Sequence, residues 1–271
     1  MKTFKVLSLL IATTFFFISC SDDSPTDPNG SKNFFPKNIG NYWIFNEYSL
    51  DIENQKENAD SPLLDSAAIT GTVTAFGKDL LKYDVFTFID DAFEKKYDMQ
   101  IAYEDESLFI RSNYFNSFFQ FEELGMELPF QLPDTVLKVV DIKNPYKREV
   151  YSRKFDEVSI PDSPVGDLKV NGSMTIFSTK TGEETISING NNVQAIKYTI
   201  PISFDGTIGI TTPFPYKEKF VFALNYNVYL AENIGIVKTH LESEVINIPL
   251  IDYDYNYLGF LTELIRYNIV K

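Results

Sequence analysis

Alternating apolar and polar residues run through most of this chain. Over 168–176 the apolar residues include Leu168, Val170 and Ile176, with polar residues between them, and 196–205 repeats the alternation. A period of two places successive side chains on opposite faces of a strand, so we expect each strand to have one buried and one wet face. After the first residues, no long stretch has the three-and-four spacing of an amphipathic helix.

Ten further segments are expected to be strands, because they alternate in the same way or are rich in β-branched and aromatic residues. They span 42–50, 68–75, 83–89, 98–103, 107–113, 136–141, 149–155, 219–230, 235–246 and 258–270. The prediction is an all-β, antiparallel fold of roughly a dozen strands, either one sandwich or a barrel-like curved sheet.

Glycine and proline punctuate these segments. Three dipeptides predict hairpin turns: Thr181-Gly182, Asn189-Gly190 and Asp205-Gly206. Proline lacks the amide hydrogen that a ladder needs, so Pro201 predicts an edge strand or a bulge.

The first 19 residues are built like an export signal. Lys2 and Lys5 give it a positive start, and 6–18 is mostly apolar. Such a run is too short to span a bilayer comfortably. We therefore predict a cleaved signal peptide over 1–19.

Residues 17–20 resemble the looser lipobox of Bacteroidota lipoproteins. The sequence there is Phe17-Ile18-Ser19-Cys20, with Phe where the stricter pattern has Leu. The resemblance implies that signal peptidase II cuts before Cys20, whose thiol takes a diacylglycerol and whose new amine takes a third acyl chain such as palmitate. Several acyl chains hold a protein stably at a membrane, where one chain is marginal.

A polar segment separates Cys20 from the first apolar cluster, Phe34-Phe35. Residues 21–31 are acidic and rich in Pro and Gly, which is typical of a solvated tether. This composition disfavours the alternative, a free cysteine buried after an uncleaved helix. We predict a flexible tether over 20–32 and a single all-β domain over 33–271.

The predicted tether also contains a candidate localisation signal. Ser21, in place of Asp, resembles lipoproteins sent to an outer membrane. Ser21-Asp22-Asp23 further resembles the acidic signal that exposes Bacteroidota lipoproteins on the cell surface. The resemblance implies an outer-membrane lipoprotein displayed on the surface, with a periplasm-facing position as the alternative.

Two segments near the ends of the predicted domain also resemble Bacteroidota lipoproteins. Residues 35–45 are FPKNIGNYWIF, in which a Pro and a Gly-Asn turn precede a strand with Trp43. Residues 229–238 are YLAENIGIVK, an aromatic residue followed by a turn and then Gly-Ile-Val-Lys. The resemblance implies an all-β lipoprotein and no particular activity.

Charge and cysteine content exclude several classes of function. Without Lys2 and Lys5 the chain keeps 22 of its 24 basic residues against 38 acidic ones, a formal net charge of −16. Such a surface repels phosphate backbones, so we expect no nucleic-acid partner. Cys20 is the only cysteine, so its lipidation leaves no thiol for a disulfide, thiol catalysis or a thiolate zinc site.

His240 is the only histidine, and a hydrolase triad or a histidine metal site needs at least one. In the strand 235–246 the expected core face consists of Val237, Thr239, Leu241, Ser243 and Val245. The opposite face then holds Lys238, His240, Glu242 and Glu244, a solvated ladder of charge. We therefore expect a surface histidine without a catalytic role.

Carboxylates alone can hydrolyse glycans if two of them lie at a suitable separation. Two neighbouring pairs are Asp90-Asp91 and Glu122-Glu123. Adjacent residues of a strand point to opposite faces, so exposed loop charge is the favoured interpretation of both pairs.

A Ca²⁺ site is a further candidate near the C-terminus. Asp252, Asp254 and Asn256 occupy alternate positions, and Glu263 is the twelfth residue counted from Asp252, as in an EF-hand loop. Tyr257 occupies the sixth position, where that loop requires glycine, and the flanks predict strands. A polar hairpin tip is favoured, with a loop of another kind around Ca²⁺ as the alternative.

Two short motifs predict a modification. Asp65-Ser66-Ala67 and Asp134-Thr135-Val136 resemble the acceptor sequence of Bacteroidota O-glycosylation. The resemblance implies glycans on Ser66 and Thr135.

Aromatic residues make up 15% of the chain, a share that suits either of two roles. Exposed rings stack on sugars and an aromatic-lined interior can hold an apolar ligand, whereas most aromatic residues of β proteins fill the core. We expect core positions for most of them, including Trp43. The aromatic cluster over 113–121 breaks clean alternation and forms either an exposed lip or core on both faces.

Three functional classes remain. The first is a non-catalytic binding module for a glycan or another envelope ligand, since the chain combines an anchor, a tether, many aromatic residues and few catalytic ones. The second is a structural or protein-interaction lipoprotein, because an exposed sheet edge can recruit a partner. The third is a carboxylate-dependent glycan hydrolase.

Overall fold

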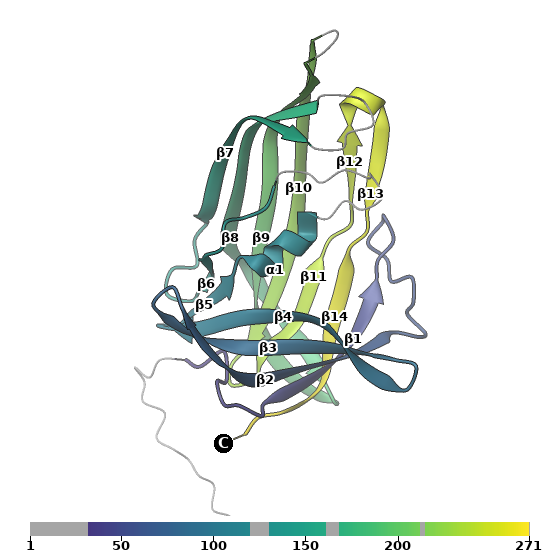
Figure 1. Cartoon of the computed structure of the whole chain (residues 1–271). Helices are drawn as coiled ribbons and strands as arrows, with labels where there is room; N and C mark the ends of the chain where they lie inside the picture. Colours follow the sequence, from purple (N-terminus) through teal and green to yellow (C-terminus); the bar gives the residue numbers. More distant parts are fainter. Residues whose placement is uncertain (1–31, 120–129, 161–167, 212–214, 271) are drawn as a thin grey trace, which may run out of the picture. The chain divides into compact units, whose positions relative to one another are not determined.

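The computed structural model describes residues 32–119, 130–160, 168–211 and 215–270, which are mostly β-strand (Figure 1). The strands are β1 (Tyr42–Ser49), β2 (Leu63–Ala75), β3 (Lys78–Ile89), β4 (Ala92–Glu104), β5 (Ser107–Arg111), β6 (Val136–Asp141), β7 (Arg148–Ile160), β8 (Leu168–Ile188), β9 (Asn191–Ile210), β10 (Tyr216–Ala231), β11 (Gly235–Leu241), β12 (Glu244–Ile248), β13 (Tyr253–Tyr257) and β14 (Phe260–Asn268). The helical segments are α1 (Asn113–Asn116), η1 (Ser117–Phe119) and η3 (Pro249–Ile251).

One antiparallel sheet of 12 strands has the order β6-β5-β4-β3-β2-β1-β14-β11-β10-β9-β8-β7, and β12 and β13 form a separate pair. The large sheet is nearly closed and barrel-like, because its edge strands β6 and β7 approach each other. The predicted all-β antiparallel class is therefore confirmed, in its barrel-like form.

Side chains join the two edges of the sheet where no backbone ladder does. The Ser178 hydroxyl donates to the carbonyl oxygen of Val139 at 2.5 Å, and the Arg148 guanidinium donates to that of Lys138 at 2.7 Å. These bonds satisfy edge carbonyl groups of β6 that would otherwise need water or another strand.

Alternation along the strands is confirmed where the sequence is most regular. Leu168, Val170 and Ile176 are buried on β8, and of the residues opposite them on β9, Ile208 and Ile202 are buried and Ile210 is partly buried. The inward face of the sheet is therefore apolar along these two long strands, as a period of two predicts.

Of the three predicted turns, only Asn189-Gly190 lies between strands, where it connects β8 to β9 with φ values of 49° and 80°. The prediction for Thr181-Gly182 is wrong, since both residues lie inside β8. The register with β9 shifts there, between Lys180 and Gly182, so the glycine marks a bulge instead.

The prediction for Asp205-Gly206 is also wrong, because both residues lie inside β9. Gly206 lies directly opposite Gly172 of β8. A Cβ on Gly206 would come within 2.1 Å of a backbone oxygen of β8 and 2.8 Å of the Phe204 ring. Glycine is required here because the two backbones approach each other closely beside the Phe204 ring, which leaves no space for a Cβ.

Pro201 does not lie at an edge, because β9 is paired with both β8 and β10. The pairing with β8 passes from Ile176–Ile202 directly to Thr179–Thr199, so the ladder is interrupted at the proline. The missing amide hydrogen is thus accommodated by a local gap in a central strand.

The predicted strand 235–246 is two strands, β11 and β12, separated at Glu242-Ser243. The expected core face holds as far as Ser243, which is buried, but Val245 is exposed and Ile246 is buried. The interruption shifts the alternation by one residue, and β12 pairs with β13 in the separate sheet.

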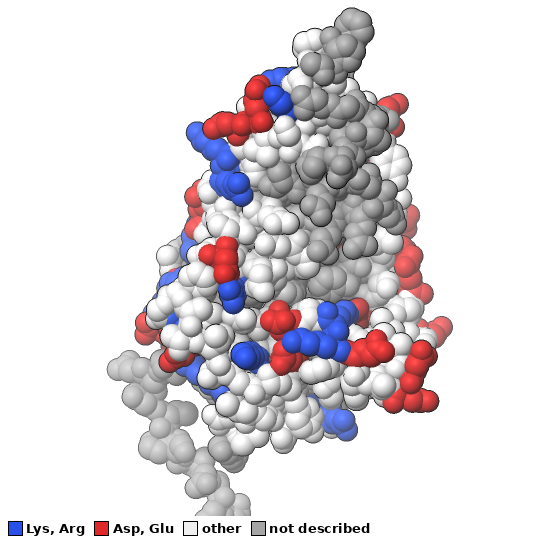
Figure 2. Space-filling model, in the orientation of Figure 1, with Lys and Arg blue, Asp and Glu red and all other residues white. Residues whose placement is uncertain are grey.

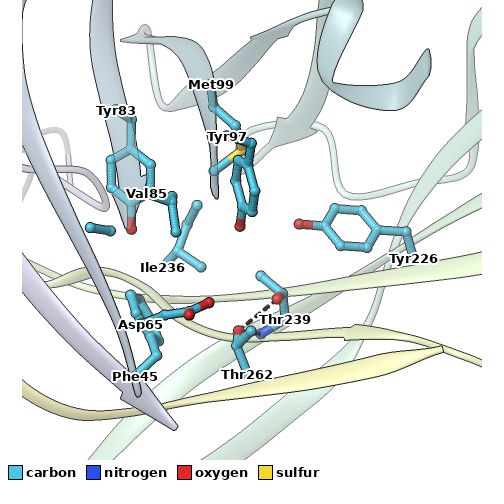
Figure 3. Close-up of a pocket in the computed structure, with 11 residues that line it drawn as sticks. Phe45, Asp65, Tyr83, Val85, Tyr97, Met99, Tyr226, Ile236, Thr239 and Thr262 are labelled. Carbon is cyan, nitrogen blue, oxygen red and sulfur yellow. Dashed lines mark hydrogen bonds between the residues drawn. The ribbon is translucent and has the colours of Figure 1, made fainter. Parts of the chain in front are cut away.

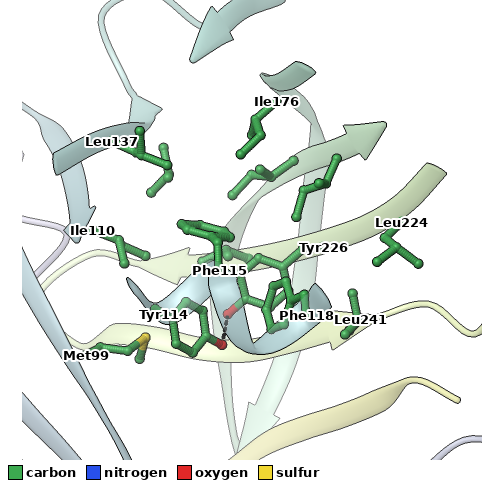
Figure 4. Packing of buried hydrophobic residues seen from close by; sticks show 14 of the residues in the cluster. Met99, Ile110, Tyr114, Phe115, Phe118, Leu137, Ile176, Leu224, Tyr226 and Leu241 are labelled. Atoms are coloured by element: carbon green, nitrogen blue, oxygen red, sulfur yellow. Dashed lines mark hydrogen bonds between the residues drawn. The ribbon is translucent and has the colours of Figure 1, made fainter. Parts of the chain in front are cut away.

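Aromatic residues fill the inside of the sheet. Tyr114, Phe115, Phe118 and Phe119 of α1 and η1 are all buried, so the 113–121 cluster is core as far as it is described and its reading as an exposed lip is wrong. The Tyr114 hydroxyl is 3.0 Å from that of Tyr226 on the facing β10 (Figure 4). The helical turn therefore inserts rings between the two sides of the sheet.

The two segments that resemble Bacteroidota lipoproteins pack against each other. Trp43 is fully buried, as expected, and its indole donates to the carbonyl oxygen of Ile234 at 2.7 Å. Gly235, at φ 107°, lies against the Trp43 and Phe35 rings. The centres of these two rings are 5.9 Å apart. The two sequence patterns thus encode one aromatic cluster between the start of the domain and the β10–β11 turn.

Candidate functional site

Four of the predicted functional residues lie outside the described part of the chain. These are the lipid attachment residue Cys20 and the export signal Ser21, Asp22 and Asp23. Within the described residues, no helix is both long and apolar enough to cross a membrane.

Two of the four candidate Ca²⁺ ligands are engaged with other partners. Asp254 accepts a hydrogen bond from the Asn247 amide at 2.8 Å, and Glu263 pairs with Lys56 at 2.8 Å. Asp252 follows η3, and Asn256 lies on β13. Among the described residues no three His, Cys, Asp or Glu side chains form a group that could hold a metal ion. The geometry thus adds no support to the calcium prediction.

One predicted modification site lies on a central strand and the other just before the edge strand β6. Ser66 is half-buried on β2, which is paired with both β1 and β3. Thr135 is half-buried before β6, and its amide donates to the Ser112 hydroxyl at 3.0 Å. Glycosylation of these hydroxyls stays a prediction.

The predicted acid pairs do not form a catalytic centre in the described residues. Asp90-Asp91 is the exposed turn between β3 and β4, as expected of loop charge. Glu122-Glu123 lies outside the described residues. The sequence interpretation missed a different pair, Glu47 and Asp65, which the fold brings together.

The inside of the sheet holds a cavity of only about 20 Å³, room for about one water molecule. Most of its lining is apolar, but it also contains a polar set: Figure 3 shows the hydroxyls of Tyr83, Tyr97 and Tyr226 and the carboxylate of Asp65 directed toward the space between β2–β4 and strands β10, β11 and β14. Thr239 and Thr262 complete it, with their hydroxyls 2.7 Å apart. The cavity is too small for a sugar ring or an acyl chain.

Burial suppresses ionisation of the tyrosines around this cavity. Burial raises the pKa of Tyr226 to about 12 and raises the pKa of Tyr83 further still. Both phenols therefore stay neutral over the physiological range and act only as hydrogen-bonding groups.

Two carboxylates share one lysine beside this cavity. Asp65 is 1% exposed, accepts a hydrogen bond from Thr87 at 2.7 Å and lies 3.2 Å from the Lys96 ammonium. Lys96 also bonds Glu47. Burial raises the pKa of Glu47, and the nearby Asp65 raises it further, while Lys96 opposes both effects.

A β-bulge places the lysine there. The β3–β4 register passes from Val85–Tyr97 to Phe86–Lys95, so Lys96 is the unpaired residue of the bulge. The extra residue lets Lys96 reach the carboxylates of β1 and β2 while Tyr97 still faces the cavity. Asp65 itself occupies an inward position of β2, two residues before buried Ala67.

The outer face of the sheet carries a hydrogen-bonded row of polar side chains around His240. The Thr199 hydroxyl donates to Asn227 at 2.7 Å, and the Asn227 amide donates to Glu242 at 3.0 Å. Asn225 donates to the other oxygen of Glu242 at 2.9 Å. The predicted face of His240 is thus confirmed, but the row is a fixed network and not a solvated ladder.

His240 is half-buried in this row. Its Nε2 atom is buried and has no hydrogen-bond partner among the described residues. Burial lowers the pKa of His240, Lys238 and Lys197 lower it further, and Glu242 opposes them. The imidazole is therefore neutral at neutral pH, with one donor and one acceptor nitrogen.

A hollow of about 480 Å³ lies on the outer face between the segment 50–61 and strands β11 and β14. It is lined by Leu50, Asn54, Gln55, Lys56, Ala59, Lys238, His240 and Leu261. Its volume falls in the range of small-molecule sites, about 300–1,000 Å³. We call it the His240 hollow.

The segment that forms one wall of the His240 hollow is fixed in place. Asn54, at φ 62°, exchanges two hydrogen bonds with the backbone of Ser243, at 2.7 and 3.3 Å. The Lys56 ammonium lies 3.8 Å above the Tyr48 ring centre and pairs with Glu263. The hollow is therefore a built feature of the fold and largely preformed.

Charge is distributed unevenly over the surface. Figure 2 shows acidic side chains along the right-hand edge of this face and basic side chains mixed with acidic ones across its lower part. On β3 and β4, Lys95 lies 3.0 Å from Asp84 and 3.5 Å from Asp98. Both lysines of the His240 hollow are likewise paired, Lys56 with Glu263 and Lys238 with Glu184.

Comparison with known proteins identifies no family for this chain. No family model and no curated protein matches the chain. Among solved structures, one described as a putative lipoprotein from Parabacteroides distasonis is 15% identical at a TM-score of 0.45. One described as a putative exported protein with YmcC-like fold from Bacteroides fragilis is 13% identical at 0.42. Each match covers 88% of this chain and 100% of the other. Likeness at this level carries no argument about function.

Proposed function

We propose that this chain is a lipid-anchored protein of the cell envelope whose β domain is a non-catalytic binding module for a glycan or another polar ligand. The observation that carries the proposal is the His240 hollow, with its neutral imidazole beside Asn54 and Gln55 and two apolar walls at Leu50 and Leu261. Sugars present hydroxyls and apolar ring faces together, so a site for them combines hydrogen-bonding side chains with apolar surface.

The size of the internal cavity favours an external site. The cavity of about 20 Å³ that the described residues line inside the sheet is too small for a carried ligand, whereas about 480 Å³ outside accommodates a sugar ring. The paired state of Lys56 and Lys238 favours neutral sugars over strongly anionic ones, since their ammonium groups already contact carboxylates.

The location rests on the N-terminal sequence. A signal over 1–19, a lipobox ending at Cys20 and an acidic tether support attachment to the outer membrane through lipid. Ser21, Asp22 and Asp23 support display on the cell surface, with a periplasm-facing position as the alternative. Incorporation of a labelled fatty acid, lost in Cys20→Ala, tests the anchor, and digestion of intact cells with protease tests the side of the membrane.

The glycan hydrolase alternative has weaker support. Glu47 and Asp65 are two neighbouring carboxylates, but both are bound to Lys96, and the cavity that Asp65 lines is the size of a water molecule. A glycosidase places its two acids on either side of the bond that it cuts, about 5–9.5 Å apart and open to the substrate. The protein-interaction alternative is supported by a separate surface, the turn between β3 and β4, where Phe88, Ile89 and Phe93 are exposed.

Binding of the mature chain, 20–271 with Cys20→Ser to keep it in solution, tests the proposed site. We expect saturable binding to one member of a panel of neutral and acidic oligosaccharides. Gln55→Ala and His240→Phe should weaken it at least about tenfold, the cost of one lost hydrogen bond to a bound ligand. The matched control is Asn192→Ala, an exposed amide outside the hollow. No binding to any glycan, or equal binding by all variants, would contradict the proposal.

A further inference from the structure

The turn between β3 and β4 exposes a group of large apolar side chains. Phe88, Ile89 and Phe93 are 39%, 43% and 51% exposed, although the Phe88 and Phe93 rings pack on each other at 5.1 Å. We call residues 88–93 the β3–β4 tip. Apolar side chains gathered on an exposed hairpin, rather than scattered, mark a contact surface.

The apex of the tip is acidic and conformationally costly. Asp90 and Asp91 both have positive φ, 49° and 65°, where glycine is the usual residue of a two-residue hairpin turn. Neither aspartate has an ion pair with any residue that the structure describes. Two unpaired carboxylates therefore stand beside the exposed rings.

A second hollow, of about 520 Å³, is lined by outer-face residues of β1, β2 and β14 and by residues at the end of β8 and in its turn to β9. Its lining is Ile44, Leu64, Ser187, Asn189, Ile265 and Arg266. Arg266 is exposed and has no ion pair with any described residue. We call it the Arg266 hollow: an apolar floor with one free guanidinium, the complement of the tip in both respects.

The tip and the Arg266 hollow belong to one continuous surface. The β2–β3 ladder ends at the pair Asp65–Thr87, so Leu64 and Phe88 are the residues that follow directly on each strand, and both belong to the outer face. Leu64 lines the hollow and Phe88 begins the tip. Because the tip and the Arg266 hollow are neighbours on one surface, two copies related by a two-fold axis can each place their tip in the hollow of the other. The same contact is then made twice.

We propose that two copies of this chain associate through this surface, the β3–β4 tip of each seated in the Arg266 hollow of the other. Asp90 and Asp91 of one copy then pair with Arg266 of its partner, and Phe88 and Phe93 cover the apolar floor. With a formal charge of −16 on each mature chain, two copies repel overall, so the local match of charge selects this face. The contact is independent of the His240 hollow, which shares no residue with it.

Charge reversal tests the contact in solution. The mature chain with Cys20→Ser should have the mass of a dimer by light scattering at high concentration. Asp91→Lys and Arg266→Glu should each raise the dissociation constant at least about tenfold, because a charged pair is replaced by like charges. The double variant, which exchanges the two charges, should regain dimerisation.

Two further variants keep the test decisive. Glu149→Lys changes the net charge by the same amount as Asp91→Lys, but at an exposed position of β7. It should leave the dimer unchanged. If Asp91→Lys does not fold by circular dichroism, Asp91→Asn removes the charge and keeps a residue that tolerates positive φ. A monomeric parent chain at every concentration, a dimer unaffected by Arg266→Glu, or a double variant that stays monomeric would each overturn the proposal.

Discussion

The two faces of the sheet use polar residues in opposite ways. On the inner face Asp65, Glu47 and Lys96 neutralise one another beside a cavity of about 20 Å³, so their hydrogen bonds serve the fold. On the outer face, His240 lines a hollow of about 480 Å³, and its buried Nε2 atom has no hydrogen-bond partner in the part of the chain that the structure describes. A polar group that the fold leaves unsatisfied next to open space is the better candidate for ligand binding.

The inner face should tolerate change least where backbones touch. Gly206→Ala places a Cβ 2.1 Å from a backbone oxygen of β8, so we expect a loss of at least about 3 kcal/mol of unfolding free energy. Gly182→Ala is the matched control within the paired strand β8, because nothing lies within 4 Å of its Cβ. We expect a change within about 1 kcal/mol there. Urea denaturation of both variants measures the difference, and equal losses would contradict this account of Gly206.

The charge cluster of the inner face should be the next most sensitive feature. Lys96→Met leaves Asp65 and Glu47 without their common cation, and we expect a loss of about 2–3 kcal/mol, below the value for a fully buried pair because Lys96 is 29% exposed. Lys95→Met, one residue away with a side chain 51% exposed, should change stability far less, because exposed ion pairs contribute little. Chemical denaturation at neutral pH compares them. A Lys96→Met chain as stable as Lys95→Met would show that the cluster contributes nothing.

The outer face should show the opposite response. His240→Phe removes an unsatisfied buried nitrogen and keeps a ring of similar size, so stability should stay within about 1 kcal/mol or rise. Loss of ligand binding without loss of stability would separate function from folding at this position.

The same variant should change the pH dependence of stability. The pKa of His240 is lowered in the folded state, so the unfolded chain binds its proton at higher pH. Its contribution to stability is present above about pH 6.5, the unfolded value, and is lost as the pH falls through the lower folded value. The raised pKa of Glu47 acts in the opposite direction and is common to both chains. The stability of the parent chain relative to His240→Phe should therefore fall between about pH 7 and 5; a constant difference would contradict the assignment.

The sequence predicts the strands well and the sites poorly, for physical reasons. A period of two identifies β8 and β9 and the outer face of His240, because burial of one face is a local property. It does not reveal the bulge that aims Lys96 at Asp65, since a bulge depends on the register of two strands. Asp65 could have been recognised, because it is a polar residue on the same strand face as buried Ala67. The predicted strand began at residue 68, however, and so did not include Asp65.

The His240 hollow could not be predicted for another reason. It exists because the segment 50–61 packs across β11 and β14, and the bonds between Asn54 and Ser243 join residues 189 positions apart. Glycines illustrate the same limit, because Gly206 resembles a turn residue by its neighbour Asp205 and is used for a contact with β8. Periodicity reports which face a residue occupies and says nothing about what covers that face.

The central claim, that ligand binds at the outer hollow and not inside the sheet, can be tested with two unique probes. The chain has one histidine and one tryptophan, so each gives a single ring signal in a magnetic resonance spectrum. His240 lines the hollow, whereas Trp43 is fully buried in the core. Titration of the mature chain, with Cys20→Ser, by the oligosaccharide panel should move the His240 imidazole signal saturably and leave the Trp43 indole signal in place. A saturable ligand that moves Trp43 and not His240 would contradict the account.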